Sequence, residues 1–228
     1  MSHYTASELQ ALRHQPLAAQ MKALSIGIYH SHIYQHLIHH LPLTELPELW
    51  LGAGALTQWV WNILHHQPDT QHVKDIDLLY FDADTRWESE DKIIRQVKAC
   101  ASDSSALPWP VDLKNVARIH LWYEERCGRP LPAPYKSLAD SVSTWPFTAS
   151  ALAVRLCPPQ HVEPEAIALD WIAPFGFDDV LQGLLRPNLV LATPEVCQEK
   201  AQRWQAQWPQ LTFVESAQFT SGSCYTRS

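Results

Sequence analysis

Hydrophobic and polar positions along the chain change period several times, which predicts helices and strands in mixed order. Apolar spacing near 3.6 residues, bounded by capping residues and prolines, predicts helices at 5–14, 18–40, 55–66, 88–100, 115–127, 177–185 and 195–208. Short apolar runs predict strands at 76–81, 109–113, 147–157, 165–172 and 211–214. Together these elements predict an α+β fold, in which helices pack on a mixed β-sheet.

The strand predicted at 76–81 carries the first candidate chemistry. Its sequence is almost continuously apolar, apart from Asp77, and is typical of a buried central strand. Asp75 lies two positions earlier, so both carboxylates are expected on one face of the strand, with their Cα atoms about 6.6 Å apart. Asp112 interrupts a second short apolar strand. Carboxylates in such places need metal ions or other partners, and carboxylate oxygens suit Mg²⁺.

These three aspartates are therefore the predicted catalytic and metal-binding residues, with Mg²⁺ or Mn²⁺ as cofactor. On neighbouring strands, Asp75, Asp77 and Asp112 would complete a two-metal site. The expected reaction is in-line attack of a hydroxyl on the α-phosphorus of a nucleoside triphosphate, with pyrophosphate leaving. Asp112 is also a candidate general base for that hydroxyl.

A glycine turn supplies a candidate phosphate site. The chain has seven glycines, and Gly52 and Gly54 lie one residue apart, directly before the helix predicted at 55–66. Glycines before a helix let backbone N–H groups approach a phosphate, which the helix N-terminus favours. Further candidates for phosphate contact are Lys74, Lys114 and Arg118. The last two lie four positions apart, which would place them on one helix face.

Length and composition limit the domain organisation. The chain has 228 residues, of which 46% are hydrophobic, enough for one core or for one core with a small appendage. Prolines concentrate at 130–134, the best candidate for a junction between lobes. We expect a core with N-terminal helices over 1–130, and strands and helices over 131–228 that complete or extend the same domain.

Charge and cysteine content limit which binding partners and which cellular location are expected. Seventeen basic and 24 acidic residues give a net charge of −7, which disfavours binding of long nucleic acids. The acceptor hydroxyl is left open between a small metabolite, a protein and an RNA end. Five cysteines without a CxxC pair, and the lack of a leader-like start, suggest free thiols and a cytoplasmic location. No apolar run reaches about 18 residues, so no membrane partner is expected.

The order of these motifs resembles the polymerase β-like nucleotidyltransferase superfamily. More narrowly, the chain is similar to a bacterial family known as nucleotidyltransferase family proteins. The matching stretches are Leu51–Asn62, Lys74–Asp82, Val111–His120, Trp145–Pro146 and Ala173–Asp179. The resemblance covers residues 30 to 190 and implies a nucleotidyltransferase-like core, extended by a C-terminal α/β part, and metal-binding carboxylates. It implies no particular substrate. Where superfamily members commonly have Gly-Ser, this chain has Gly-Ala-Gly, so backbone amides would have to hold the phosphate.

Two other functions compete with nucleotidyl transfer. The same fold can serve as a non-catalytic nucleotide-binding or protein-interaction module, and ten tryptophans would suit an interface as well as a core. Alternatively, residues 78–85 resemble the first motif of haloacid dehalogenase-like phosphohydrolases, which would make Asp82 the nucleophile.

Two further features leave their roles open. His32, His36 and His40 recur every four residues, a spacing that can bind zinc but that favours a polar helix face here. Arg155 interrupts an apolar strand and is expected either to pair with a carboxylate or to bind a triphosphate.

Overall fold

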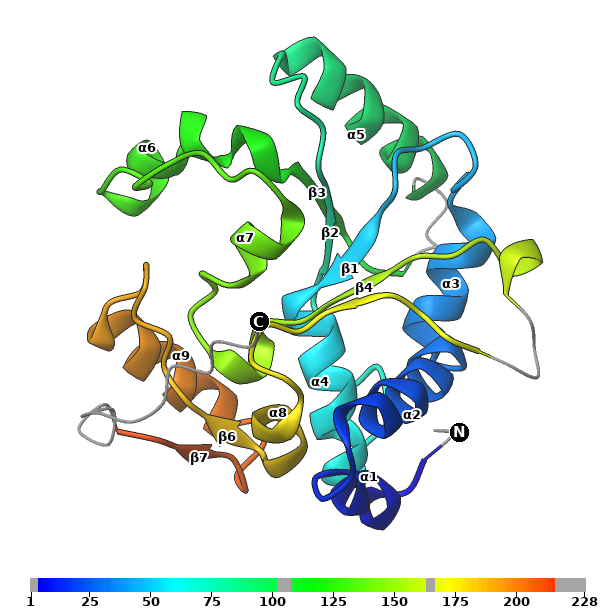
Figure 1. Ribbon diagram of the computed structural model, residues 1–228, viewed down its shortest axis with the longest axis vertical. Helices are drawn as coiled ribbons and strands as arrows, with labels where there is room; N and C mark the ends of the chain where they lie inside the picture. Colours follow the sequence, from blue (N-terminus) through cyan, green and yellow to red (C-terminus); the bar gives the residue numbers. More distant parts are fainter. Residues whose placement is uncertain (1–3, 102–107, 163–166, 216–228) are drawn as a thin grey trace.

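The computed structural model describes residues 4–101, 108–162 and 167–215 (Figure 1). Its α-helices are α1 (Ala6–Leu12), α2 (Leu17–Tyr29), α3 (His32–His40), α4 (Ala53–Leu64), α5 (Trp87–Ala101), α6 (Tyr123–Cys127), α7 (Leu138–Val142), α8 (Asp178–Gln182) and α9 (Pro194–Gln205). Its strands are β1 (Trp50–Gly52), β2 (Ile76–Tyr80), β3 (Val111–Asn115), β4 (Ala153–Arg155), β5 (Trp171–Ile172), β6 (Leu184–Leu185) and β7 (Thr212–Phe213). Three 3₁₀ turns are η1 (Val116–Leu121), η2 (Thr148–Ser150) and η3 (Pro159–His161).

The main sheet is mixed, which confirms the predicted α+β class. Its five strands have the order β3-β2-β1-β4-β5, and β6 and β7 form a separate parallel pair. β2 and β3 run parallel, and the crossover between them contains α5. The other neighbours in the main sheet are antiparallel. The short central strand β1 therefore lies between β2 and β4, and its last residue leads directly into α4.

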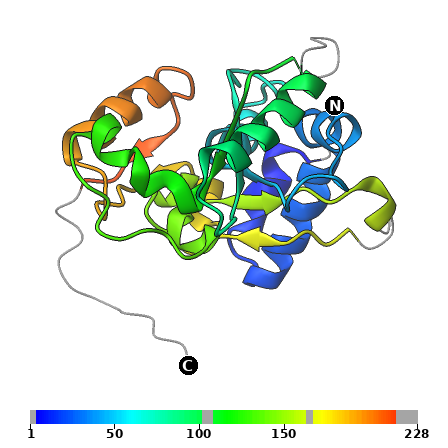
Figure 2. The same cartoon turned by 90° about the horizontal axis from the view of Figure 1, so that it is seen from above.

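The helix α4 forms the centre of the core. Trp59 and Trp61 of this helix are fully buried, and Trp61 contacts the rings of Trp204 and Trp208 at centroid distances of 5.1 and 5.5 Å. The C-terminal part of the chain thus packs on the N-terminal part through aromatic rings. Figure 2 shows α9 and the segment containing α6 and α7 on one side of the molecule, with the N-terminal helices on the other.

Two helices that the sequence predicts as continuous are interrupted in the structure. The helix expected at 18–40 is broken into α2 and α3, because the side chain of Ser31 caps the start of α3 by accepting the N–H of Tyr34. The helix expected at 115–127 is a 3₁₀ turn followed by α6. Lys114 therefore lies on β3 rather than on a helix, and the predicted helix face shared with Arg118 does not exist.

The predicted hairpin in the second half is shorter than expected. Residues 148–150 form η2, so the strand expected at 147–157 is reduced to β4. β5 pairs with β4 in antiparallel fashion, as the pattern indicated, whereas residues 163–166 between them lie outside the described residues. Within the described ranges, no helix has the length and apolarity that a bilayer crossing requires.

Candidate active site

The site is built on one row of residues across three strands. In the strand register, Gly52 of β1 lies opposite Asp77 of β2, and Asp77 lies opposite Asp112 of β3. Because paired residues in register share a face of the sheet, the two aspartates that the sequence analysis selected lie side by side. Asp75 is exposed and immediately precedes β2.

A lysine bridges the two paired carboxylates. Lys114 follows Asp112 by two positions on β3, so its side chain lies on the same face. Its Nζ is 2.6 Å from Oδ2 of Asp112 and 3.6 Å from Oδ1 of Asp77. A cation therefore already lies between these two side chains.

Electrostatic forces at Asp77 act in opposite directions. Burial raises the pKa of this carboxyl, Lys114 lowers it, and the negative charges of Asp75 and Asp112 raise it further. The net effect is a pKa above the ordinary value. The other two predicted aspartates thus both act on the pKa of Asp77, although Asp75 lies outside the regular strand.

The donor chemistry is compatible with a hard divalent cation, but a compact ligand cluster is not formed. Across residues 4–101, 108–162 and 167–215, no group of three or more histidine, cysteine, aspartate or glutamate side chains is arranged to hold a metal ion. Asp77 and Asp112 nevertheless supply carboxylate oxygens around one positive charge, that of Lys114. Oxygen donors of this kind are those that Mg²⁺ prefers.

The glycine turn lies next to this row. A Cβ atom on Gly52 would lie 2.8 Å from Cη2 of Trp145 and 2.9 Å from Cδ1 of Leu79, so close packing requires glycine there. Ala53 has a φ of 43°, a left-handed conformation that is uncommon for alanine and often found at functional sites. The start of α4 has no side-chain cap, so its first N–H groups have no side-chain partner there.

A cavity of about 740 Å³ opens beside the row and the turn. Ala53, Asp77 and Lys114 line one side of it. Aromatic side chains from the segment around α6 and α7 line another part: Trp122, Tyr123, Tyr135 and Trp145. Arg126 and Arg129 add positive charge, and Thr193 and Val196 contribute the start of α9. The cavity thus joins the acidic row to an aromatic and cationic wall.

Sequence reasoning missed most of this wall. Trp145 was noted only within the family resemblance, and Arg126 and Arg129 fall on a short helix and a proline-rich connection that carry no recognisable motif. These residues lie 45 or more positions from Asp77 along the chain, so no local spacing could have connected them.

Other predicted ligands lie in different surroundings. Arg118 is buried, and its Nε is 2.6 Å from Oε2 of Glu90, so its charge is paired within the fold. Lys74 is exposed before β2.

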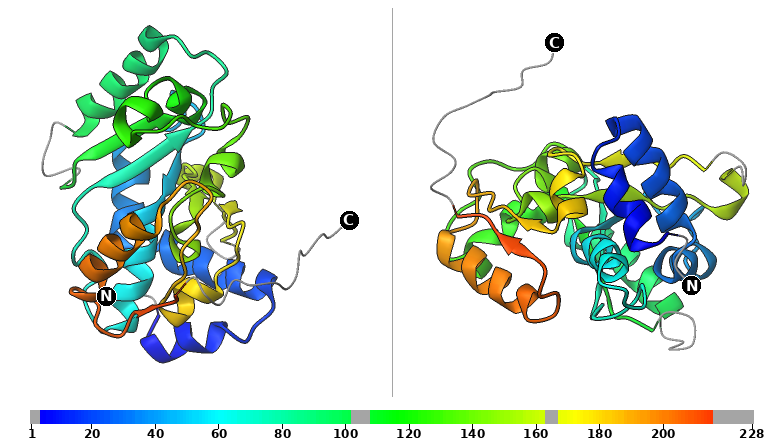
Figure 3. Two further views of the ribbon diagram at one scale, coloured as in Figure 1. Left: turned by 90° about the vertical axis from the view of Figure 1, so that its left-hand side faces the viewer. Right: turned by 90° about the horizontal axis from the view of Figure 1, so that it is seen from below.

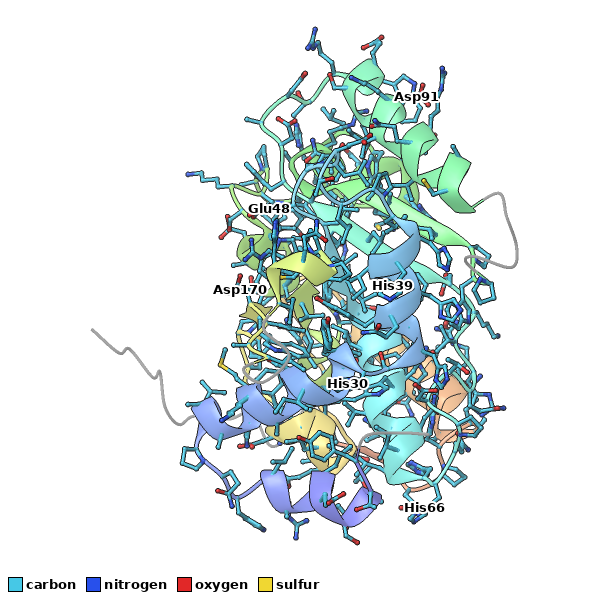
Figure 4. All side chains as sticks on the ribbon, turned by 90° about the vertical axis from the view of Figure 1, so that its right-hand side faces the viewer. His30, His39, Glu48, His66, Asp91 and Asp170 are labelled. Atoms are coloured by element: carbon cyan, nitrogen blue, oxygen red, sulfur yellow. The ribbon has the colours of Figure 1, made fainter. Side chains whose placement is uncertain are left out.

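Arg155 pairs with two carboxylates, as one of its two interpretations expected. Glu48 lies 2.8 Å from it and Asp170 2.6 Å. Figure 4 labels both acidic residues on the same face of the molecule.

Asp82, the nucleophile of the phosphohydrolase alternative, and the histidines of the zinc alternative make contacts with residues close to them in the structure. Asp82 lies in the loop after β2, where its carboxylate accepts the N–H of Asp84 at 2.8 Å. His32 contacts Asp69 through Nδ1 at 2.9 Å, and His36 contacts the backbone oxygen of His32. His36 and His40 lie with their ring centroids 6.0 Å apart. The face of α3 is therefore built from hydrogen bonds and ring contacts.

Comparisons with solved structures show the fold. The chain is similar to a structure described as a CCA-adding enzyme head domain determined by NMR, with a TM-score of 0.62 and 22% identity, covering 91% of this chain and all of that one. It also matches a Thermotoga maritima CCA-adding enzyme complexed with tRNA (TM-score 0.40, 13% identity, 96% of this chain) and a complex of a CCA-adding enzyme with ATP (TM-score 0.36, 14% identity, 95% of this chain). This chain spans 44% of each of those two proteins.

Comparison with sequence families shows the relationship directly. No curated protein matches the chain. A family model described as Nucleotidyltransferase matches residues 39–213, a range that contains the glycine turn, all three aspartates and the cavity wall. This match, over most of the chain, shows that the chain belongs to the nucleotidyltransferase family.

Proposed function

We propose that this protein transfers a nucleotidyl group from a nucleoside triphosphate to a hydroxyl acceptor, with release of pyrophosphate and in dependence on Mg²⁺ or Mn²⁺. The observation that carries the proposal is the row of Gly52, Asp77 and Asp112, in which two carboxylates surround one positive charge beside the uncapped start of α4. Such a row offers ligands for a cation and for a phosphate at one edge of a cavity.

The carboxylates provide the proposed metal ligands. Asp77 and Asp112 would hold the ion, because the ammonium of Lys114 already lies between their carboxylates. Asp75, whose negative charge acts on Asp77, would join them as a third ligand. When bound, Mg²⁺ or Mn²⁺ supplies charge neutralisation for the triphosphate and activation of the attacking hydroxyl. Lys114 is then free to pair with a phosphate instead of with the carboxylates.

The remaining chemistry is assigned to groups of this chain. Backbone N–H groups at Gly54 and at the residues after it bind a phosphate at the start of α4, where the helix dipole favours negative charge. Asp112 accepts the proton of the attacking hydroxyl. Lys74 stays a proposed phosphate contact, whereas the ion pair with Glu90 gives Arg118 a role within the fold.

The cavity would hold the nucleoside and the acceptor. Its aromatic walls suit a planar base, and its volume of about 740 Å³ is within the usual range for small-molecule sites. We propose a small hydroxylated molecule or a protein side chain as acceptor, since the net charge of −7 disfavours long nucleic acids. The four described cysteines are free thiols, which supports a reducing compartment such as the cytoplasm.

The proposal is tested by thermal melting with each of the four nucleoside triphosphates, with and without Mg²⁺ or Mn²⁺. A ligand at 100 times its Kd stabilises by about 2.7 kcal/mol, which raises the Tm of a chain of this size by about 5 to 11 °C. We expect a metal-dependent rise for at least one triphosphate, and its loss in Asp77→Asn. Asp82→Asn is the matched control, because its carboxylate lies in the loop after β2, and should keep the full rise.

Different outcomes separate the rival functions. If Asp82→Asn lost the effect and Asp77→Asn kept it, the phosphohydrolase alternative would gain support. Binding of a triphosphate without transfer of its α-labelled phosphate to any acceptor would favour a non-catalytic module. Absence of a shift with all four triphosphates would overturn the proposal.

A further inference from the structure

The ammonium of Lys114 occupies the space between the two carboxylates that are proposed to bind the metal ion. Its Nζ lies 2.6 Å from Oδ2 of Asp112, at hydrogen-bond distance, and 3.6 Å from Oδ1 of Asp77. One positive charge of the protein therefore already offsets part of the negative charge of this pair. A divalent ion that binds the same oxygens directly has to displace the ammonium.

The pairing of β2 with β3 sets this position. Asp77 lies opposite Asp112 in the register, and Lys114 follows two positions later, opposite Leu79. Because side chains alternate along a strand, Asp112 and Lys114 project from the same face of β3. The side chain of Lys114 is only 23% exposed, and an ammonium with so little access to water needs anionic partners. In this structure the two aspartates are those partners.

The cavity provides a second place for the same side chain. Lys114 lines the cavity of about 740 Å³ together with Asp77 and with Ala53 at the start of α4. Helices α6 and α9 lie on this side of the main sheet (Figure 3, left), and their residues contribute another part of the cavity wall. Lysine carries a compact charge on a flexible four-carbon stem, so the ammonium can turn from the carboxylates toward an anion in the cavity.

We propose that Lys114 is an internal counter-ion that competes with divalent metal ions for Asp77 and Asp112 until a phosphate-bearing ligand enters the cavity. This inference rests on the proposed function and adds to it a residue that couples metal binding to nucleotide binding. A phosphate that attracts the ammonium frees the two carboxylates, which then bind the metal ion more tightly. Because coupling between two sites is reciprocal, the metal ion raises the affinity for the phosphate-bearing ligand by the same factor.

The competition is tested by titrating the full chain with Mn²⁺ in the absence of nucleotide, with the unbound ion measured by electron paramagnetic resonance. We expect Lys114→Met to bind Mn²⁺ about ten-fold more tightly than the wild type, because the variant lacks a positive charge within 3.6 Å of both carboxylates. Lys114→Gln, which keeps a hydrogen-bond donor for Asp112, should show the same gain if Lys114→Met does not fold. Lys114→Arg retains the charge and should bind Mn²⁺ as weakly as the wild type.

Two controls show where such a gain arises. Lys98→Met removes the same charge from an exposed position of α5 and should leave the affinity for Mn²⁺ unchanged. Adding Asp77→Asn to Lys114→Met should abolish the gain, because it removes one of the two carboxylates that Lys114 contacts.

The coupling is measured by calorimetry with the triphosphate that stabilises the protein, once with saturating Mg²⁺ and once with EDTA. The ratio of the two dissociation constants gives the factor by which the metal ion raises the affinity for the triphosphate. This factor should be several-fold smaller in Lys114→Met than in the wild type, and unchanged in Lys98→Met. An unchanged factor in Lys114→Met would overturn the coupling.

The results separate this inference from the proposed function. If Lys114→Met and Lys114→Gln bind Mn²⁺ no more tightly than the wild type, the competition is wrong, while nucleotidyl transfer stands. A gain of the same size in Lys98→Met also overturns the inference, because the effect would then follow the net charge of the protein. If Lys114→Met gains affinity for Mn²⁺ but no triphosphate binds to the wild type, the competition is supported and the proposed function fails.

Discussion

Single charges at the centre of the site have effects on stability that can be measured without any ligand. Asp77 has a raised pKa, because burial and two neighbouring carboxylates outweigh Lys114. A carboxyl with a higher pKa in the folded state favours folding at low pH, and that contribution is lost as the pH rises through the folded-state pKa. Ionised Asp77 therefore destabilises the free protein near neutral pH.

We accordingly expect Asp77→Asn to melt at a higher temperature than the wild type at pH 7, without nucleotide or metal. The side chain is 35% exposed, so solvent screening limits the gain to less than about 1 kcal/mol, or about 2 to 4 °C. The difference should shrink as the pH falls through the raised pKa of the wild-type carboxyl, because the protonated carboxyl no longer carries the unfavourable charge. Melting curves over this pH range check the sign; a lower Tm for the variant at pH 7 would mean that the pair with Lys114 dominates.

The two glycines of the turn should respond differently to the same substitution. A methyl group at Gly52 meets Trp145 and Leu79 at less than 3 Å, so Gly52→Ala is expected to destabilise the protein by about 1 to 3 kcal/mol through overpacking. Gly54 has 3.5 Å of space to Gln58 and lies within α4, so Gly54→Ala should be neutral or stabilising by up to about 1 kcal/mol. Urea unfolding of both variants makes the comparison, and equal stabilities would contradict the packing argument.

Among the elements, α5 is tied to β3 and η1 by one buried ion pair. Glu90 of α5 pairs with Arg118 of η1, and its second oxygen accepts the N–H of Asn115 at 2.8 Å. This cluster fixes the end of β3, the strand that carries Asp112. Arg118 thus acts on the site indirectly, because its ion pair with Glu90 helps to hold β3 in place.

Arg118→Met is expected to destabilise the protein by about 3 to 5 kcal/mol, because it leaves the Glu90 carboxylate buried without its charge partner. Nucleotide affinity of the folded fraction should not change. Arg95→Met, which removes an exposed pair with Asp91 on the same helix, is the control and should cost less than about 1 kcal/mol. Unfolding curves and nucleotide titrations of both variants test this expectation. If Arg118→Met kept its stability but lost nucleotide affinity, Arg118 would be a phosphate ligand.

At the scale of the whole molecule, the two halves of the chain share one sheet and one core. β4 and β5, from the second half, extend the sheet next to β1, and Trp204 and Trp208 cover Trp61 of α4. The stiff connection at 130–134 is therefore a candidate junction between parts that depend on each other for burial of their apolar surfaces.

We predict that the chain unfolds in one transition, and that a fragment of residues 1–130 does not fold alone. In the fragment, β1 would lose its neighbour β4, and Trp61 would lose both of its tryptophan contacts. Urea unfolding followed by far-UV circular dichroism and by tryptophan fluorescence should give coincident curves for the full chain. Two separated transitions, or a cooperative transition in the fragment, would show that the halves are independent domains.

Local signals in the sequence determined the elements that depend on neighbours close in the chain. The helix α1, the buried strand β2 and the start of α4 directly after Gly52 were all readable, because each is set by residues within a few positions. The α+β class followed from the order of these elements. The pairing of Asp77 with Asp112 was also expected, although their roles in metal binding and catalysis stay predictions.

Tertiary structure alone decided which side chains surround those aspartates. Lys114 lies on a strand between two carboxylates, and the ring of Trp145 packs against Gly52. Arg118, predicted as a phosphate contact, forms an ion pair with Glu90, a partner that no local pattern in the sequence indicates. The periodicity of apolar residues indicates which face of a helix or strand is buried. Which side chains meet at that face depends on how elements distant in the sequence pack together. In this protein, that packing places the aromatic and cationic side chains of the cavity beside the row of Asp77 and Asp112.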